Sequence, residues 1–353
     1  MSLEGPVLVV GAGLLGTSIG LALRRQGVDV ALADVSVENL RIATGLGAAN
    51  VRPDRPRLVV VAVPPDHLAD EVAKALQGTE AVVTDVGSVK SAPLARVRAL
   101  VDEDTLARYV GSHPMAGSER SGPFAASESL FDGRPWAVTP HEKADPAAVE
   151  AVTGLVEACG ATPVRFTPEE HDRAVARTSH LPHLLAALVA GRLTDAPREH
   201  LALSGQGVRD VTRIAAGDPG LWQQIVAANT DALTELLRDV RADVDTLLTA
   251  LGAGDRDEIV RLLDRGVAGT AVIPAKHGGP VLAEGVLFVA VPDHPGELAR
   301  LFSDATEIGV NIEDIRIDHD PARPVGLVEL TVAADQVDHL LASLADRGWT
   351  SHR

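Results

Sequence analysis

The chain has 353 residues, 46% of them hydrophobic and 23% charged, which is typical of a folded globular protein with room for two or three domains. Its 32 basic residues against 49 acidic ones give a formal net charge of −17, which argues against nucleic acid as a partner because phosphate backbones would be repelled. No apolar run approaches the ~18 residues that span a bilayer and no basic leader is evident, so we expect no membrane partner and no secretion. Cys159 has no second thiol with which to form an internal disulfide, which fits a reducing compartment, so we predict a cytoplasmic protein.

The first 167 residues alternate short apolar runs with helix-length segments. Continuous β-branched runs of this length are typical of parallel strands that are buried on both faces of a sheet. We therefore predict an α/β domain with a doubly wound sheet over residues 1–167. Its strands are expected at residues 6–10, 28–34, 57–64, 81–88, 108–117, 135–140 and 161–167, with a helix starting at Pro146.

The rest of the chain predicts two more domains. Strand signals disappear over residues 168–267, where apolar residues recur at three- and four-residue spacing, so an all-helical domain is expected there. Residues 268–285 mix glycine and proline as linkers do. Residues 286–353 then give the order βαββα, which predicts a small two-layer α+β domain.

A glycine-rich loop directly follows the first strand and opens a helix. Gly11 allows the tight turn, Gly13 lets a pyrophosphate approach the backbone, and Gly16 lets the helix pack closely on the strand. Leu14 and Leu15 stand where the helix N-terminus offers N–H groups to an anion. The order of strand, loop and helix therefore predicts a dinucleotide site of the Rossmann type.

An acid at the end of the second strand supports this prediction. Asp34 lies about 20 residues beyond the loop, where a carboxylate can accept hydrogen bonds from both ribose hydroxyls. It would repel a 2′-phosphate, and residues 35–37 offer no cation to bind one, so NAD is favoured over NADP. The sequence alone leaves Arg24, Arg25 and Arg41 as cations that folding could bring near.

Four further segments contain polar residues in patterns typical of a substrate site. They are TDVGSVK at 84–90, GSHPMAGSE at 111–119, SHLPH at 179–183 and DVTR at 210–213. The first two follow strands, and strand carboxyl ends are the binding side of an open α/β sheet. Pro114 and a glycine follow His113, which places its ring on a constrained loop.

With these segments the chain resembles the prephenate dehydrogenases of the tyrosine pathway over nearly its whole length. The GSHPMAG and DVTRIA segments are specific to that family among dinucleotide dehydrogenases, and the C-terminal domain is similar to the ferredoxin-like ACT module that senses amino acids. The resemblance implies oxidation and decarboxylation of prephenate to 4-hydroxyphenylpyruvate with NAD, and a homodimer formed through the helical domain.

The resemblance also implies roles for individual residues. The catalytic histidine falls on His113, its hydroxyl-binding partner on Ser88, and the carboxylate-binding arginine on Arg213. Substrate-side positions fall on Glu119, His183 and Asp210, and cofactor-side positions include Val63 and Ser88 besides the loop and Asp34.

The chemistry suits these residue types. A neutral imidazole near pH 7 can accept the proton of the 4-hydroxyl as hydride leaves the same carbon, and no metal is needed because loss of carbon dioxide then aromatises the ring. A planar guanidinium can hold one of the two substrate carboxylates despite the chain's negative charge.

Several alternatives stay open at this point. Arogenate, which carries an amine in place of the keto group, would suit the same residues. A non-catalytic amino-acid sensor is disfavoured because His113, Ser88 and Arg213 are all present. A β-hydroxyacid dehydrogenase typically uses a lysine of its helical domain as the catalytic base. This class is disfavoured because no lysine occurs between Lys143 and Lys276. The pair His180 and His183 lacks a recognisable third ligand for zinc.

The last predicted site is regulatory. A turn at residues 292–298 resembles the effector loop of ACT domains, and we expect an aromatic amino acid, tyrosine above all, to bind there. Gly296 would let a ligand approach the backbone, and N–H groups at the following helix start could hold its carboxylate. The predicted effector residues are His294, Pro295, Gly296, Glu297 and Leu298, with Asn311 and Ile312 opening the next strand.

Overall fold

The computed structural model describes the chain except for residues 1–4, 52–54, 118–120, 274–282 and 320–324. Two compact units are distinguished, Met1–Thr249 and Ala250–Arg353, and each is described by itself.

The first unit begins with a sheet whose strands are ordered β2-β1-β3-β4-β5-β6-β7. All neighbouring strands are parallel except β5 and β6, which are antiparallel. The doubly wound sheet is thus confirmed, but the expectation of parallel strands fails at β6, because the described residues between β5 and β6 supply no crossover helix and a parallel return needs one. The strands are β1 (Val7–Val10), β2 (Val30–Ala33), β3 (Leu58–Val61), β4 (Val82–Asp85), β5 (Tyr109–Pro114), β6 (Pro135–Thr139) and β7 (Thr162–Arg165).

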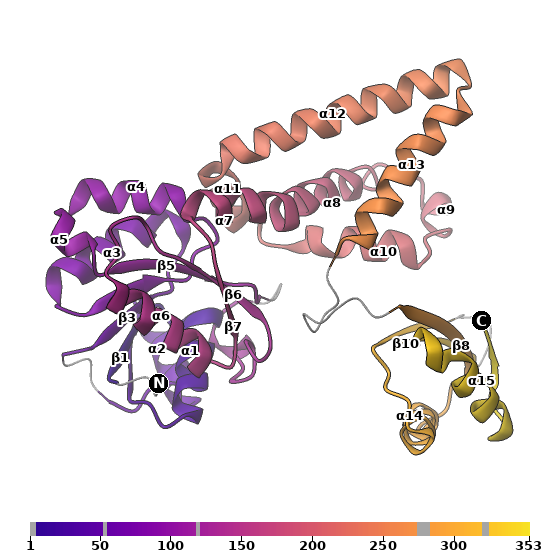
Figure 1. Cartoon of the computed structure of the whole chain (residues 1–353), viewed down its shortest axis with the longest axis horizontal. Helices are drawn as coiled ribbons and strands as arrows, with labels where there is room; N and C mark the ends of the chain where they lie inside the picture. Colours follow the sequence, from indigo (N-terminus) through magenta and orange to yellow (C-terminus); the bar gives the residue numbers. More distant parts are fainter. Residues whose placement is uncertain (1–4, 52–54, 118–120, 274–282, 320–324) are drawn as a thin grey trace. The chain divides into compact units, whose positions relative to one another are not determined.

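Helices cover both faces of this sheet (Figure 1). One face packs against α1 (Leu14–Arg25), α2 (Val37–Gly45) and α6 (Pro146–Ala158). The other packs against α3 (Pro65–Gly78), α4 (Ser91–Leu100) and α5 (Glu103–Leu106). Strand residues alternate between the two cores: Val60 faces the first, whereas Val59 and Val61 face the second. Burial on both faces explains why these strands read as continuous apolar runs.

A helical region follows from residue 168, as predicted. Its N-terminal helix α7 (Pro168–Val175) starts with a capping box, in which Thr167 and Glu170 each bond the other's backbone N–H. The helical elements after it are η2 (Ala176–His180), α8 (Leu181–Gly191), α9 (Arg198–Leu201), α10 (Gln206–Arg213), η3 (Ile214–Ala216), α11 (Pro219–Ala228), α12 (Thr230–Ala253) and α13 (Arg256–Ala271). Within the described residues, none of the helices combines the length and apolar character needed to cross a membrane.

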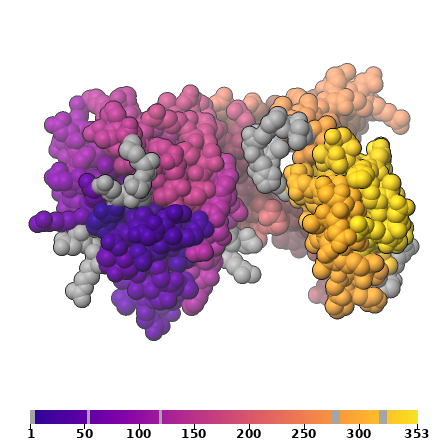
Figure 2. All heavy atoms as spheres, turned by 60° about the horizontal axis from the view of Figure 1, so that its bottom comes forward, coloured from indigo at the N-terminus to yellow at the C-terminus, as the bar shows by residue number. Residues whose placement is uncertain are grey.

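The C-terminal residues fold as β8 (Glu284–Pro292), α14 (Glu297–Ile308), β9 (Asp314–His319), β10 (Val325–Ala333), α15 (Val337–Asp346) and β11 (Thr350–His352). The sheet order is β11-β8-β10-β9, with every neighbouring pair antiparallel. One sheet face packs on α14 and α15 through Leu287, Val289, Leu330 and Leu340. Figure 2 draws these residues as spheres, coloured orange to yellow.

Two details of this domain differ from the expected βαββα order and its linker. The final strand β11 was not predicted, because Thr-Ser-His is too short and polar to give a strand pattern. The range 268–285 assigned to a linker also contains the last turn of α13 and the first residues of β8.

Candidate active site

The turn after β1 is so tight that two of its positions require glycine. Gly11 has φ +106°, and a Cβ there would lie 2.3 Å from the carbonyl oxygen of Ala62, just beyond β3. A Cβ on Gly16 would lie 1.9 Å from the carbonyl oxygen of Gly11, so α1 can approach the turn only without a side chain here. The space around the Cβ position of Gly13 is open, which leaves room for a ligand beside the backbone.

The first turn of α1 and the Asp34 carboxylate lie at this glycine turn. No described side chain caps α1, so its first N–H groups, including those of Leu14 and Leu15, are free for an anion. The Asp34 carboxylate accepts hydrogen bonds from the N–H of Ala12 at 2.5 Å and of Ser36 at 2.6 Å. Each carboxylate oxygen keeps further acceptor capacity, so ribose hydroxyls can still bind.

A cleft of about 800 Å³ opens at the carboxyl ends of β1, β2 and β3. Of the predicted cofactor residues, Gly11, Gly13, Asp34 and Val63 line it, whereas Leu14, Leu15, Gly16 and Ser88 are not in its lining. Leu15 packs on the core instead. The cleft, the open backbone at Gly13 and the uncapped helix fit a dinucleotide. The other lining residues are Val10, Ala33, Val35, Ser36, Asn39, Ala62, Pro64, His67, Asp70, Glu71 and Lys74.

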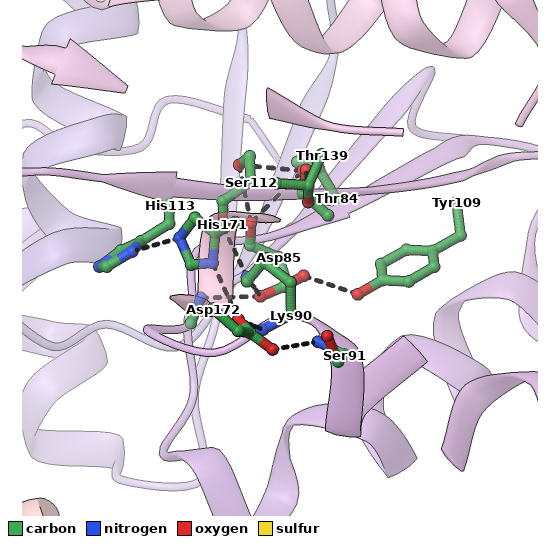
Figure 3. A network of polar contacts seen from close by, with 12 residues as sticks. Thr84, Asp85, Lys90, Ser91, Tyr109, Ser112, His113, Thr139, His171 and Asp172 are labelled. Atoms are coloured by element: carbon green, nitrogen blue, oxygen red, sulfur yellow. Dashed lines mark hydrogen bonds and ion pairs between the residues drawn. The ribbon is translucent and has the colours of Figure 1, made fainter. Parts of the chain in front are cut away.

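His113 lies near the end of β5 and begins a line of polar contacts (Figure 3). Its Nδ1 is 3.0 Å from Nε2 of His171, and Nδ1 of His171 is 2.9 Å from Oδ1 of Asp172. His171 and Asp172 are buried and come from α7, so the line joins the sheet to the helical region. The His113 ring is half-buried, and its other nitrogen faces away from the labelled network in Figure 3.

Asp172 also caps a helix of the sheet domain. Its two carboxylate oxygens accept the N–H groups of Lys90 and Ser91, each at 2.8 Å, at the start of α4. No described side chain within α4 or next to it does this. A carboxylate at a helix N-terminus satisfies unpaired N–H groups and interacts favourably with the helix dipole. Asp172 is therefore fixed in place from two sides.

A buried ion pair lies beside this line. The Lys90 ammonium donates to Oδ1 of Asp85 and, at 2.7 Å, to the carbonyl oxygen of Ser112. The Tyr109 hydroxyl donates to Oδ2 of Asp85 at 2.7 Å. These contacts tie the end of β4 to β5 next to His113 and place a cation close to the histidine pair.

These surroundings shift the acidity of the histidines. Burial lowers the pKa of His113 well below its usual value, and the neighbouring His171, Lys90 and His180 side chains disfavour a further positive charge and lower it more. Burial also lowers the pKa of His171, against the opposing hydrogen bond to Asp172. Burial alone would raise the pKa of Asp172, but bonds from His171, Ser91 and Lys90 outweigh it, so this pKa is lowered. His113 is consequently neutral, and Asp172 ionised, near pH 7.

Ser88 is not part of the line of polar contacts that begins at His113. It follows β4 and lines a separate hollow of about 210 Å³ between α3, α4 and α11. In the described part of the chain no hydrogen bond joins its hydroxyl to His113, and its predicted role in binding the substrate hydroxyl stays a prediction.

The helical residues implied by the resemblance gather around α8 and the end of α10. His183 stacks on Trp222 with ring centroids 3.5 Å apart and bonds the backbone of Ile214, next to Arg213. Arg213 is exposed and has no hydrogen bond or ion pair to any residue that the structure describes. Asp210 accepts a hydrogen bond from Gln206 at 2.9 Å rather than pairing with Arg213. Glu119 lies outside the described residues.

The pair His180 and His183 makes contacts other than metal ligation. His180 is bonded to Asn229, with 3.2 Å between Nδ1 and Nδ2, and burial lowers its pKa to about 4. Among the residues that the structure describes, no group of three His, Cys, Asp or Glu side chains is arranged to hold a metal ion.

The predicted effector turn connects β8 to α14. Gly296 has φ +97°, a conformation that favours glycine, and a Cβ there would meet nothing within 4 Å. Glu297 begins α14, and Leu298 packs on the core with Ile312. The Asn311 amide donates to Glu313 at 2.7 Å.

Sequence reasoning missed His171, Asp172 and the Lys90–Asp85 pair. Lys90 and Asp85 stood in a quoted segment without a role, and His171 and Asp172 stood in none. The one available signal is an adjacent His-Asp in the first helix after the sheet domain, which has no spacing rule of its own.

Family models and individual relatives both match this chain to prephenate dehydrogenases. The model of the prephenate dehydrogenase nucleotide-binding domain matches residues 19–165, and that of the prephenate dehydrogenase dimerization domain matches residues 167–265. The probable prephenate dehydrogenase NovF of Streptomyces niveus is 38% identical over 98% of this chain and 99% of its own length. Two solved structures are similar over most of their length. Prephenate dehydrogenase from A. aeolicus, in complex with hydroxyphenyl propionate and NAD⁺, has TM-score 0.69 and 26% identity, covering 77% of this chain and 99% of its own. Synechocystis arogenate dehydrogenase has TM-score 0.65 and 27% identity, covering 75% of this chain and 98% of its own.

Proposed function

Because this chain belongs to the prephenate dehydrogenase family, we propose that it oxidises and decarboxylates prephenate to 4-hydroxyphenylpyruvate with NAD as cofactor. The observation that carries the proposal is His113, a histidine held neutral at the end of β5, in the sheet whose strand ends form the dinucleotide cleft. The chain is an oxidoreductase, and its cleft residues Gly11, Gly13 and Asp34 fit NAD.

His113 is the general base of the proposed reaction. Gly11, Gly13 and Asp34 would hold NAD⁺, which would supply the acceptor for the hydride of the ring carbon that carries the 4-hydroxyl. Nε2 of His113 accepts the hydroxyl proton, because Nδ1 is engaged with His171. Carbon dioxide then leaves, its bonding electrons make the ring aromatic, and the ring oxygen takes the proton back from His113. The protein thus supplies binding, orientation and one reversible proton transfer.

Arg213 is the proposed partner of a substrate carboxylate. Its guanidinium is exposed and unpaired among the described residues, and a guanidinium can bind a carboxylate through two parallel hydrogen bonds. His183 supports this position indirectly, since it is stacked on Trp222 and bonded to the backbone next to Arg213. Ser88, Asp210 and Glu119 remain proposed from the resemblance alone.

The test is a rate measurement with purified protein, NAD or NADP, and prephenate or arogenate. We expect reduction of NAD with prephenate, and a fall in turnover of ~10²–10⁴ in His113→Asn with NAD affinity little changed. Turnover of arogenate in preference to prephenate would assign the chain to the second substrate. Near-normal turnover of His113→Asn would remove His113 from the mechanism.

The proposed assembly is a homodimer formed through the helical domain. Four apolar side chains of α12 recur at three- and four-residue spacing and are exposed, namely Val244, Leu247, Leu248 and Leu251. Such a stripe lies along one face of a helix and is typical of a surface that a second copy covers. Sedimentation of the wild-type chain and of Leu248→Glu tests this, and a wild-type monomer would contradict it.

The C-terminal domain is proposed to be an ACT-like sensor of an aromatic amino acid. Its βαββαβ order and antiparallel sheet are those of a ferredoxin-like fold, and the open Gly296 turn leads into an α14 start that no described side chain caps. Tyrosine is expected to change the activity of the whole chain and to leave a chain ending at Val272 unaffected. Equal inhibition of both chains would place the effector at the active site instead.

A further inference from the structure

His171 has both ring nitrogens engaged, and this fixes the positions of protons along the line to His113. Asp172 is ionised and accepts hydrogen bonds through both oxygens, so Nδ1 of His171 must carry a hydrogen to bond it. A neutral imidazole has only one N–H, so Nε2 of His171 holds a lone pair. That atom lies 3.0 Å from Nδ1 of His113 and can only accept a hydrogen bond there.

The lone pair on Nε2 of His171 determines which nitrogen of His113 carries hydrogen. If His171 accepts, Nδ1 of His113 must be the donor, and the lone pair of His113 is then on Nε2. Figure 3 shows this second nitrogen facing away from the labelled network, so no labelled residue occupies it. A His113 ring without this partner would exchange between two tautomers, and only one of them has its lone pair on Nε2.

We propose that His171 is a positioning residue that selects the reactive tautomer of His113, and that Asp172 in turn orients His171 while it caps α4. This inference rests on the proposed role of His113 as the base. Other polar groups near the pair do not provide the same acceptor: Lys90 and Tyr109 are donors bonded to Asp85, and His180 is bonded to Asn229.

Variants of His171 separate the acceptor from the bulk of the ring. In His171→Asn the side chain reaches only the Nδ1 position, so it can still donate to Asp172 but leaves His113 without an acceptor. In His171→Gln the longer amide can present its oxygen to Nδ1 of His113. His141→Asn is the matched control, because His141 is likewise buried with both ring nitrogens bonded, but to the backbone of Leu106 and Lys143.

The expected kinetic result is a loss confined to turnover. His171→Asn should lower kcat about 10- to 100-fold, less than the ~10²–10⁴ that a whole general base contributes, with KM for prephenate and NAD within threefold. His171→Gln should recover at least part of the loss, and His141→Asn should keep kcat within twofold. Unchanged kcat in His171→Asn, or equal losses in the Asn, Gln and control variants, would overturn the proposal.

A second measurement does not depend on turnover or on the substrate. Nitrogen-15 spectra of the histidine rings, with His113 assigned by its absence in His113→Asn, report which nitrogen bears hydrogen. Wild-type protein near pH 7 should show hydrogen on Nδ1 of His113, and His171→Asn should show both tautomers. Hydrogen on Nε2 in the wild type would overturn the proposal even if prephenate is the substrate. The expected spectra without any turnover of prephenate would instead count against the proposed function alone.

Discussion

In the glycine loop, one glycine is expected to be needed for folding and another for NAD binding. Adding a methyl group at Gly16 and, separately, at Gly13 tests the two roles one at a time. In Gly16→Ala the new Cβ would stand 1.9 Å from the carbonyl oxygen of Gly11, where an ordinary contact is 3.4–4 Å. Helix α1 or the turn must therefore move by about 1.5 Å. In Gly13→Ala the new Cβ meets nothing within 4 Å, and its φ of −79° suits alanine.

The expected effects differ in kind. Overpacking by a methyl group that only backbone movement can relieve costs about 1–3 kcal/mol, so Gly16→Ala should lower the Tm by several degrees and weaken NAD binding as a consequence. Gly13→Ala exchanges one residue at a helix N-cap and should cost less than about 1 kcal/mol of stability. It should nonetheless weaken NAD binding at least tenfold, because the methyl group occupies the space that the pyrophosphate needs.

Thermal unfolding without ligand and calorimetric titration with NAD measure the two quantities separately. The wild-type chain and a substitution at the end of α8, Gly191→Ala, provide the controls, since a Cβ on Gly191 also meets nothing within 4 Å. If Gly13→Ala binds NAD within twofold of the wild type, the pyrophosphate does not pass this backbone. If Gly16→Ala is as stable as the wild type, the close approach of α1 to the turn is not required.

Three further predictions concern the residues around the reaction. Because the pKa of His113 lies well below its usual 6.5 and its neutral form is the proposed base, kcat should stay constant as the pH falls through 6.5 and decline only well below it; an acid limb centred near 7 would contradict this. Arg213→Ala should raise KM for prephenate at least tenfold with a smaller change in kcat, since the lost contact is to a bound carboxylate, and a change under threefold would make Arg213 structural. Asp34→Ala should weaken NAD binding and reduce the preference of the enzyme for NAD over NADP. It removes the ribose acceptor, the charge that opposes a 2′-phosphate and the acceptor of the Ala12 and Ser36 N–H groups. A wild type that prefers NADP would refute the assignment of NAD as cofactor.

The parts of the fold that sequence analysis predicted are those whose physical cause is local. Gly11 and Gly16 face backbone atoms of the turn itself or of the adjacent strand end, so their spacing within six residues carries the signal. The strands of the first sheet are buried on both faces and read as apolar runs without knowledge of their neighbours. The NAD cleft and the helical domain follow from such patterns.

The parts that were missed depend on residues distant in the chain. His113 and His171 are 58 positions apart, and the N–H groups that Asp172 caps are 81 and 82 positions before it. An adjacent His-Asp on a helix has no periodicity that marks it as part of a site. The antiparallel β6 was missed for a related reason, because strand direction depends on the connection and not on the strand's own residues.

The state of His113 shows why net charge does not determine local acidity. A charge of −17 would by itself favour protonation of a histidine, but exposed charges more than about 8 Å away are screened at physiological salt. Burial, the Lys90 ammonium and two neighbouring histidines act at short range and in the opposite direction. Asp85 and Asp172 are close as well, yet Asp85 is bonded to Lys90 and Tyr109, and Asp172 to His171 and the start of α4. His113, the proposed base, is therefore kept neutral because each nearby carboxylate already has its own partners.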